Sequence, residues 1–226
     1  MASCQNVCYK LVCKVALVLV DSEVALIETQ TEMRKRIANL TSNILNPFLL
    51  ILAMILLLSF ISASSTLDAL KWALVSIALS ILPVFSVTVY LVRKGSLDAV
   101  FTNVREQRTK LYLLGGFFTV ISCIILAYTG APSILVAGFI TGLSTAIIFT
   151  CINLWWKISL HTALVAASAT VLVMLYGWIA VATVALVPLT GWARIELEYH
   201  SLAQATTGAL LAALIVILVF YPLALA

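Results

Sequence analysis

Long apolar runs, almost free of charged side chains, recur from residue 47 to the end of the chain and constrain its fold most. Of the 226 residues, 63% are hydrophobic and 10% are charged, whereas soluble domains contain about 25% charged residues. Lipid must therefore solvate much of the surface. Inside a bilayer every backbone N–H and C=O needs a partner within the protein, which leaves helices or closed barrels. Because the apolar runs do not alternate with polar residues, they predict an all-α, polytopic transmembrane helix bundle.

The spacing of these runs predicts about six to seven spans, since a helix needs about 20 apolar residues to cross the hydrocarbon core. The expected spans are 47–62, 69–92 with a kink at Pro83, 111–128, a fourth that follows a tight turn at Gly130 and Pro132 and ends at Trp156, 160–176, 178–189, and 205–225. The fifth and sixth are short. They form either a hairpin that turns at Gly177, which we favour, or one long helix that would change the topology.

Residues 1–44 are expected to form a separate N-terminal segment ahead of the transmembrane domain, residues 45–226. The segment lacks the pattern of a cleavable signal peptide and predicts one or two amphipathic helices on the membrane surface or packed on the bundle. Its cysteines have spacings that fit no strong metal motif, so we expect reduced thiols rather than zinc ligands, with palmitoylation as an alternative. These cysteines are Cys4, Cys8 and Cys13.

Basic residues indicate the orientation of the spans. With seven spans, all of the 13 Lys and Arg residues except Lys71 fall on one side of the membrane. The positive-inside rule places that side in the cytoplasm. The same scattering at span ends argues against a nucleic-acid partner, which would need a concentrated basic patch. The sequence gives no indication of oligomeric state.

Three polar patches are expected on this same face, and they contain both histidines of the chain. They are Arg105-Glu106-Gln107-Arg108-Thr109-Lys110, Lys157-x-Ser159-x-His161 and Arg194-x5-His200-x3-Gln204. Arginine forks bind phosphate oxygens in pairs, and histidine serves as a nucleophile or proton carrier near neutral pH. A helix beginning near Ser159 would add free N–H groups that favour an anion. The alternative interpretation, in which the basic residues of the first patch only follow the positive-inside rule and bind no ligand, stays open.

The order and spacing of the patches resemble the type 2 phosphatidate phosphatase superfamily of membrane lipid phosphatases. That family carries Lys-x6-Arg-Pro, Pro-Ser-Gly-His and Ser-Arg-x5-His-x3-Asp. Here the third motif appears as Ala193-Arg194-x5-His200-x3-Gln204, the second as Ile158-Ser159-Leu160-His161, and the first is reduced to Arg105-x2-Arg108-Thr109. The resemblance covers roughly residues 45–225 and implies a type 2 phosphatidate phosphatase-like fold.

The resemblance also implies residue roles and metal-independent chemistry. His200 would attack phosphorus and form a phosphohistidine, oriented by Gln204, and His161 would protonate the leaving lipid oxygen. The phosphoryl oxygens would be bound by a cationic and hydroxyl set: Arg105, Arg108, Lys157, Ser159 and Arg194. The expected substrate is a lipid phosphate or diphosphate of the polyprenyl diphosphate or phosphatidate class. Few metal-ligating side chains are available, and no cofactor is expected.

Several positions depart from the family pattern. Leu160 replaces a glycine and restricts close approach of the backbone to phosphate. Gln204 replaces an aspartate, so the residue behind His200 accepts a hydrogen bond but carries no charge. These departures favour a second hypothesis, a catalytically inactive lipid-phosphate-binding or scaffold protein on the same fold. A transporter or channel is a third, weaker hypothesis, because the spans hold almost no ionisable residues at mid-bilayer.

Overall fold

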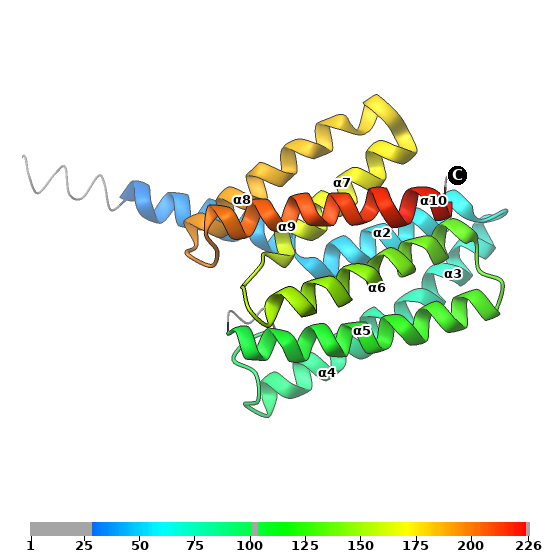
Figure 1. The fold of residues 1–226 in the computed structure, drawn as a ribbon, viewed down its shortest axis with the longest axis horizontal. Helices are drawn as coiled ribbons and strands as arrows, with labels where there is room; N and C mark the ends of the chain where they lie inside the picture. Colours follow the sequence, from blue (N-terminus) through cyan, green and yellow to red (C-terminus); the bar gives the residue numbers. More distant parts are fainter. Residues whose placement is uncertain (1–28, 101–103, 225–226) are drawn as a thin grey trace, which may run out of the picture.

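The structure is a computed structural model that describes residues 29–100 and 104–224, where every regular element is helical (Figure 1). Residues 29–44 form a helix ahead of the bundle. The elements that follow are α2 (Pro47–Ser62), α3 (Thr66–Leu79), α4 (Ile81–Arg93), α5 (Arg105–Tyr128), α6 (Ser133–Asn153), α7 (Leu160–Tyr176), the 3₁₀ helix η1 (Gly177–Ala185), α8 (Leu186–Glu196), α9 (Leu202–Ile215), the π-helical η2 (Val216–Phe220) and α10 (Tyr221–Ala224). The predicted amphipathic helices of residues 1–28 and the three N-terminal cysteines lie outside the described residues.

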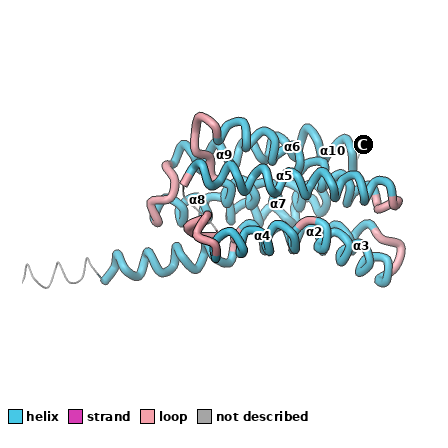
Figure 2. The backbone as a smooth tube through the Cα atoms, turned by 90° about the horizontal axis from the view of Figure 1, so that it is seen from below, coloured by secondary structure: helices cyan, strands magenta, loops and turns pink. Residues whose placement is uncertain are grey.

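Six helical stretches within the described residues are long and apolar enough to cross a membrane. They confirm the all-α, polytopic prediction, and the chain is a multi-pass integral membrane protein. At most 33% of the most apolar window of each stretch is buried inside the protein. The remaining apolar surface faces outward, where only lipid would solvate it favourably. The helices lie side by side, and residues 29–44 extend beyond one end of the bundle (Figure 2).

The kink predicted in the second span is confirmed. The stretch Thr66–Arg93 breaks at Ser80, between α3 and α4. Pro83 has no N–H to donate to the carbonyl of Leu79, so the helical ladder is interrupted there. The hydroxyl of Ser80 donates to the carbonyl of Ser76 at 2.6 Å, which satisfies a backbone group next to the break.

The hairpin predicted at Gly177 is confirmed as well. Residues Leu160–Glu196 form one uninterrupted helical stretch along the chain. Within it Gly177 has φ of +63°, a conformation that ends a right-handed helix. After it η1 and α8 fold back along α7 (Figure 1). A Cβ built on Gly191 of α8 would lie 3.8 Å from Cγ2 of Thr162 in α7. The beginning of α7 and the end of α8 therefore meet at the same end of the bundle.

Several predicted boundaries are wrong. α6 ends at Asn153, before the predicted Trp156, and two other helices are longer than predicted because polar residues continue them. α5 begins at Arg105 rather than Leu111, and α8 continues to Glu196 rather than ending near Leu189. Arg, Lys, Gln and Glu are good helix formers, so the helices extend past the apolar boundary that hydropathy detects. As a result Arg108 and Arg194 lie on helices.

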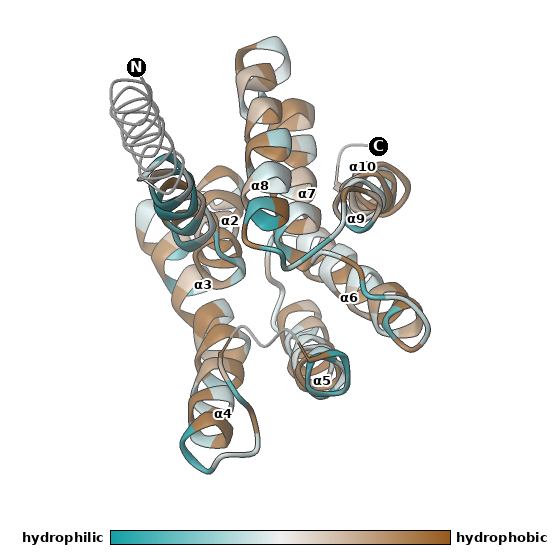
Figure 3. Ribbon diagram, turned by 90° about the vertical axis from the view of Figure 1, so that its left-hand side faces the viewer, coloured by the Kyte–Doolittle hydropathy of each residue, from teal (hydrophilic) through white to brown (hydrophobic). Residues whose placement is uncertain are grey.

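Polar segments from distant parts of the chain meet at one end of the bundle, which faces the viewer in Figure 3. Arg34 of the 29–44 helix pairs with Glu196 at the end of α8, with 2.7 Å between Nη2 and Oε2. The side-chain oxygen of Gln107 in α5 accepts from the backbone N–H of Asp98, which follows α4. We call this end of the molecule the polar end.

The first turns of α7 and α9 are in close contact at the polar end. A Cβ built on Gly208 would lie only 2.7 Å from the backbone oxygen of Ser159. Thr162 donates its hydroxyl to the carbonyls of Ser159 and Ala205. This contact brings the segment before α7 against the start of α9, and so brings the two histidine-bearing motifs together.

We predict that Gly208→Ala destabilises the protein, because the new methyl group would collide with backbone that cannot move without shifting α7. Overpacking of this kind costs about 1–3 kcal/mol. Gly191→Ala is the matched control, since its Cβ would make ordinary contacts of 3.8 and 4.0 Å. Thermal unfolding in detergent should show a lower Tm for Gly208→Ala and no loss for Gly191→Ala. Equal Tm values for the two variants would contradict the proposed close contact.

Candidate functional site

A cavity of about 350 Å³ runs between α2, α4, α5, α6, α7 and η2. Most of its wall is apolar, but one end is formed by four polar side chains: Arg108, His161, Arg194 and His200. Each of the four is only 5–7% exposed. The structure thus brings together residues from all three polar patches of the sequence, in a buried position at the polar end.

Arg108 reaches the cavity from the second turn of α5. Its Nη2 donates to the hydroxyl of Tyr112, one turn further along the same helix, at 2.5 Å, and to the backbone carbonyl of Ile158. These bonds satisfy part of the guanidinium and link α5 to the segment before α7. Arg108 also lines the cavity, and a guanidinium has further donors besides those on Nη2.

Arg194 reaches the cavity from the last turn of α8. Its Nη1 donates to the hydroxyl of Ser42, in the helix 29–44, at 2.8 Å. Its guanidinium carbon lies 4.4 Å from the centre of the Tyr199 ring, a favourable cation–π geometry. The Nε of Arg194 is buried without a hydrogen-bond partner among the described residues.

Neither buried arginine is neutralised by a carboxylate. The ion pairs among the described residues join Arg34 to Glu196 and Arg105 to Glu106, outside the cavity. A buried charge without a partner is strongly unfavourable. Two such charges at the end of one cavity are typical of a site for an anion, and the fork geometry of arginine suits phosphate.

The ring orientation of His200 is set by a capping box at the start of α9. The backbone N–H of Gln204 donates to the Ser201 hydroxyl at 3.3 Å, and the Ser201 N–H donates to Oε1 of Gln204 at 3.2 Å. That second bond identifies the amide oxygen, which lies 3.1 Å from Nδ1 of His200. Nδ1 therefore carries the proton, and Nε2 keeps the lone pair. The Ser-x-x-Gln pattern is a known N-terminal signal that would have predicted this arrangement.

The surroundings of His200 favour its neutral form. Burial lowers its pKa, the positive charge of Arg108 lowers it further, and the hydrogen bond with Gln204 opposes the change. Arg194 and Lys157 act in the same direction as Arg108. Burial also lowers the pKa of Lys157, with Arg108 and Arg194 contributing. At neutral pH the imidazole of His200 is therefore uncharged and has a free lone pair, as a nucleophile requires.

His161 lies in the first turn of α7, which begins directly after Ser159. The hydroxyl of Ser159 is fully buried and has no hydrogen-bond partner among the described residues. Its backbone N–H donates to the carbonyl of Gln204 at 3.3 Å. The first backbone N–H groups of a helix have no partner within it and favour negative charge nearby. Ser159 and His161 are thus held at the helix N-terminus beside the α9 start.

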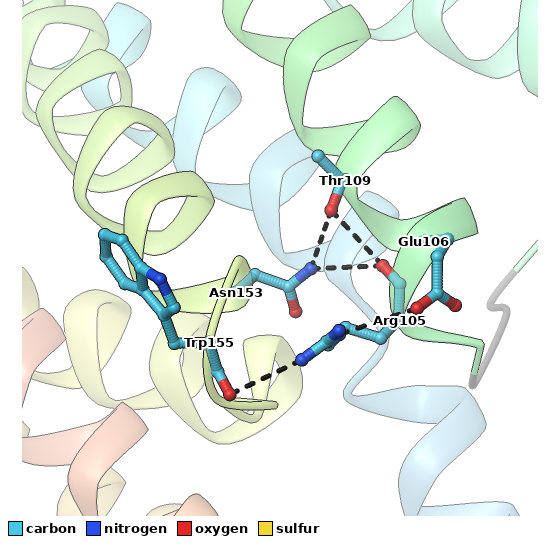
Figure 4. A network of polar contacts seen from close by, with 5 residues as sticks. All are labelled: Arg105, Glu106, Thr109, Asn153 and Trp155. Carbon is cyan, nitrogen blue, oxygen red and sulfur yellow. Dashed lines mark hydrogen bonds and ion pairs between the residues drawn. The ribbon is translucent and has the colours of Figure 1, made fainter.

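Arg105 is a predicted phosphate ligand that does not line the cavity, and the same holds for Lys157 and Ser159. Its Nη1 donates to the carbonyl of Trp155 at 3.4 Å, and its Nε lies 3.6 Å from the Glu106 carboxylate (Figure 4). Nearby, the buried amide of Asn153 donates to the Arg105 carbonyl and to the Thr109 hydroxyl. This network joins the start of α5 to the end of α6. Arg105 is half-exposed, and the contacts that it makes anchor helix ends.

Two features of the site could not be recognised in the sequence motifs. Ser42 lies in no motif but accepts a hydrogen bond from Arg194, and it belongs to the N-terminal segment that was expected on the membrane surface or packed on the bundle. The ring of Tyr199 stacks on the same arginine from the loop between α8 and α9. Tyr112, in contrast, is four residues after Arg108, and helical spacing alone would have predicted their contact.

No family model, curated protein or solved structure matches this chain. Function must therefore be argued from the chemistry of the cavity. Among the described residues no three His, Cys, Asp or Glu side chains are grouped so that they could hold a metal ion.

The lowered pKa of His200 predicts a pH dependence of stability. In the unfolded chain this histidine takes up a proton near pH 6.5, while in the folded protein it resists protonation. Its contribution to stability is therefore complete above about pH 6.5 and is lost progressively as the pH falls toward the lowered folded pKa, by at most about 1.4 kcal/mol per pH unit. Unfolding of the wild type and of His200→Gln in detergent between pH 7.5 and about 5 would measure this. The wild type should lose more stability on acidification, and parallel pH profiles would contradict the expected pKa.

Proposed function

We propose that the protein is an integral membrane phosphatase that hydrolyses a lipid phosphate or diphosphate through a phosphohistidine. The observation that carries this proposal is the grouping of two histidines and two arginines without carboxylate partners at one end of an apolar cavity. The arginines suit the phosphate, the histidines suit its transfer, and the apolar wall suits a lipid. The resemblance to type 2 phosphatidate phosphatases supports the same function and suggests the same fold.

In the first step Nε2 of His200 attacks phosphorus as the bond from phosphorus to the lipid oxygen breaks. The hydrogen bond from Nδ1–H to Gln204 supports this role, because it leaves the lone pair on Nε2. His161 donates its proton to the departing lipid oxygen. An approaching phosphate, being an anion, favours the protonated form of His161 that this transfer needs. The lipid leaves as an alcohol, or as a monophosphate where the substrate is a diphosphate.

In the second step water attacks the phosphohistidine. His161, now neutral, takes a proton from the water as the nitrogen–phosphorus bond breaks, and inorganic phosphate leaves. Arg108 and Arg194 would stabilise the charge that builds on the equatorial oxygens in both steps, and the hydroxyl of Ser159 would add a further donor. Donors aimed at developing charge usually supply the largest part of an enzyme's acceleration.

The uncharged Gln204 predicts a slow enzyme. As His200 forms its bond to phosphorus, its ring becomes positively charged, and an amide oxygen stabilises that charge less than a carboxylate would. Loss of the corresponding charge in a serine protease lowers the rate by about 10⁴. Leu160, in place of a glycine, lines the cavity and leaves less room for phosphate near the α7 backbone.

The same two residues support a second candidate function, a membrane protein that binds lipid phosphate without hydrolysing it. In that case Arg108 and Arg194 would hold the headgroup, and no phosphohistidine would form. For either function we infer that the polar end faces the cytoplasm, because the basic residues of the sequence concentrate on that side of the expected spans.

Phosphate release by purified protein in detergent tests the proposal and its alternative together. We expect release from lipid phosphates, loss of release in His200→Ala, and at least a tenfold faster rate in Gln204→Glu. The glutamate has the length of glutamine, so it keeps the bond to Nδ1 and adds the missing charge. Gln204→Ala removes both bond and charge and should be slower than the wild type.

The combination of outcomes separates the two functions. Release that persists unchanged in His200→Ala would overturn the phosphohistidine mechanism. Binding of lipid phosphate without release, in both the wild type and Gln204→Glu, would favour the binding protein. Vanadate, which imitates phosphate, should compete with the lipid in either case.

A further inference from the structure

The apolar part of the cavity extends far from the polar end. Along α5 its lining reaches from Arg108 to Thr119, which spans roughly 16 Å at about 1.5 Å per residue. Along α7 it reaches from His161 to Val171, about 15 Å by the same rise. Half of a hydrocarbon core of about 30 Å is about 15 Å. The cavity therefore reaches at least half-way through the hydrocarbon core, measured from the arginines.

The wall of this deeper part offers few hydrogen bonds to an occupant. It contains hydroxyl residues, but most of these donate to a carbonyl of their own helix and so present carbon atoms to the cavity. The satisfied hydroxyls are those of Ser80, Thr88, Thr119, Thr141 and Thr145. The remaining lining is mainly aliphatic and aromatic. A sugar or a peptide would lose hydrogen bonds to water there without replacing them, whereas a hydrocarbon chain would not.

The size of the cavity suits a ligand. Its volume of about 350 Å³ is at the lower end of the range for ligand cavities, about 300–1,000 Å³.

Two glycines keep the cavity open at different depths. A Cβ built on Gly115 or Gly142 would meet no atom within 4 Å, and both residues line the cavity. Gly115 lies about 10 Å beyond Arg108 along α5. A Cβ built on Gly116 would lie 4.0 Å from Cβ of Ala146. Ala146 in α6 therefore lies at about the same depth in the bundle as Gly116 in α5. Because the two helices are antiparallel, Gly142 lies about 6 Å deeper than Ala146.

We propose that the cavity binds a hydrocarbon chain of a lipid phosphate, and that Gly115 and Gly142 determine the chain length it accepts. The phosphate lies between Arg108 and Arg194, and the chain extends past the two glycines. This inference rests on the proposed function for the headgroup and limits its substrates by the length of the chain.

Leucine substitutions at the two glycines test the proposal, because a leucine side chain would fill the cavity at a known depth. Both glycines are helical without positive φ, so a larger residue is sterically allowed by the backbone. The matched control is Ala127→Leu, at an exposed position of α5 that does not line the cavity. Binding and phosphate release would be measured with n-alkyl phosphates of increasing length, using purified protein in detergent and a Tm check of each variant.

We expect affinity in the wild type to rise with chain length until the cavity is filled. In Gly115→Leu this rise should stop at a short chain, and long chains should bind at least tenfold more weakly than they bind the wild type. In Gly142→Leu the rise should stop at a longer chain. Ala127→Leu should behave as the wild type. If binding shows the same order of cut-off lengths but the protein releases no phosphate, the chain site is upheld and the phosphatase function is overturned.

One result would overturn the chain site while leaving the phosphatase function intact. That result is phosphate release with the same length dependence in both glycine variants as in the wild type. If Gly115→Leu fails to fold, Gly115→Ala and Gly142→Ala give the same comparison with smaller side chains, and the cut-off should again come earlier at residue 115.

Discussion

Two guanidinium groups, those of Arg108 and Arg194, are buried beside an apolar cavity, and no carboxylate of residues 29–100 or 104–224 pairs with them. In a membrane protein such charges are stable only where hydrogen bonds, aromatic faces or a ligand compensate them. Tyr112, Ser42 and Tyr199 provide part of that compensation. An anionic ligand would complete it. The contacts at the polar end thus fix both guanidinium groups beside the cavity.

The helix contacts explain how distant motifs reach that place. The turn at Gly177 returns α8 to the end from which α7 began, so Arg194 comes back beside His161. The close approach at Gly208 then sets α9 against the segment before α7. With the capping box at Ser201, this contact positions His200 and the amide behind it. Small residues at two positions thus determine the geometry of a site that contains neither of them.

Much of the fold could be predicted because lipid leaves helices as almost the only solution for long apolar runs. The kink at Pro83 and the hairpin at Gly177 followed from the backbone chemistry of proline and glycine. Helix ends were predicted poorly, because hydropathy shows where the apolar residues end and not where the backbone hydrogen bonds of the helix end. α5, which begins before its apolar run, illustrates this.

The spacing of the motifs indicated which residues of the site to examine, but not all of their contacts. Arg105 stays a predicted phosphate ligand, but its guanidinium contacts the Trp155 carbonyl and Glu106, and it does not line the cavity. Arg105 and Arg108 are three residues apart and so lie near the same face of α5. Arg105 is closer to the start of the helix and is half-exposed, whereas Arg108 is buried. Ser42 was missed because its partner is 152 residues away in the chain.

Chemical trapping of the intermediate tests the central claim most directly. Purified protein would be mixed with a lipid phosphate labelled in its phosphoryl group, quenched in alkali during turnover, and digested for mapping. A phosphoryl group on His200 that survives alkali, is lost in acid and disappears in His200→Ala is the result that the account predicts. Turnover without a labelled protein, or a label that resists acid and maps to a hydroxyl residue such as Ser159, would contradict it.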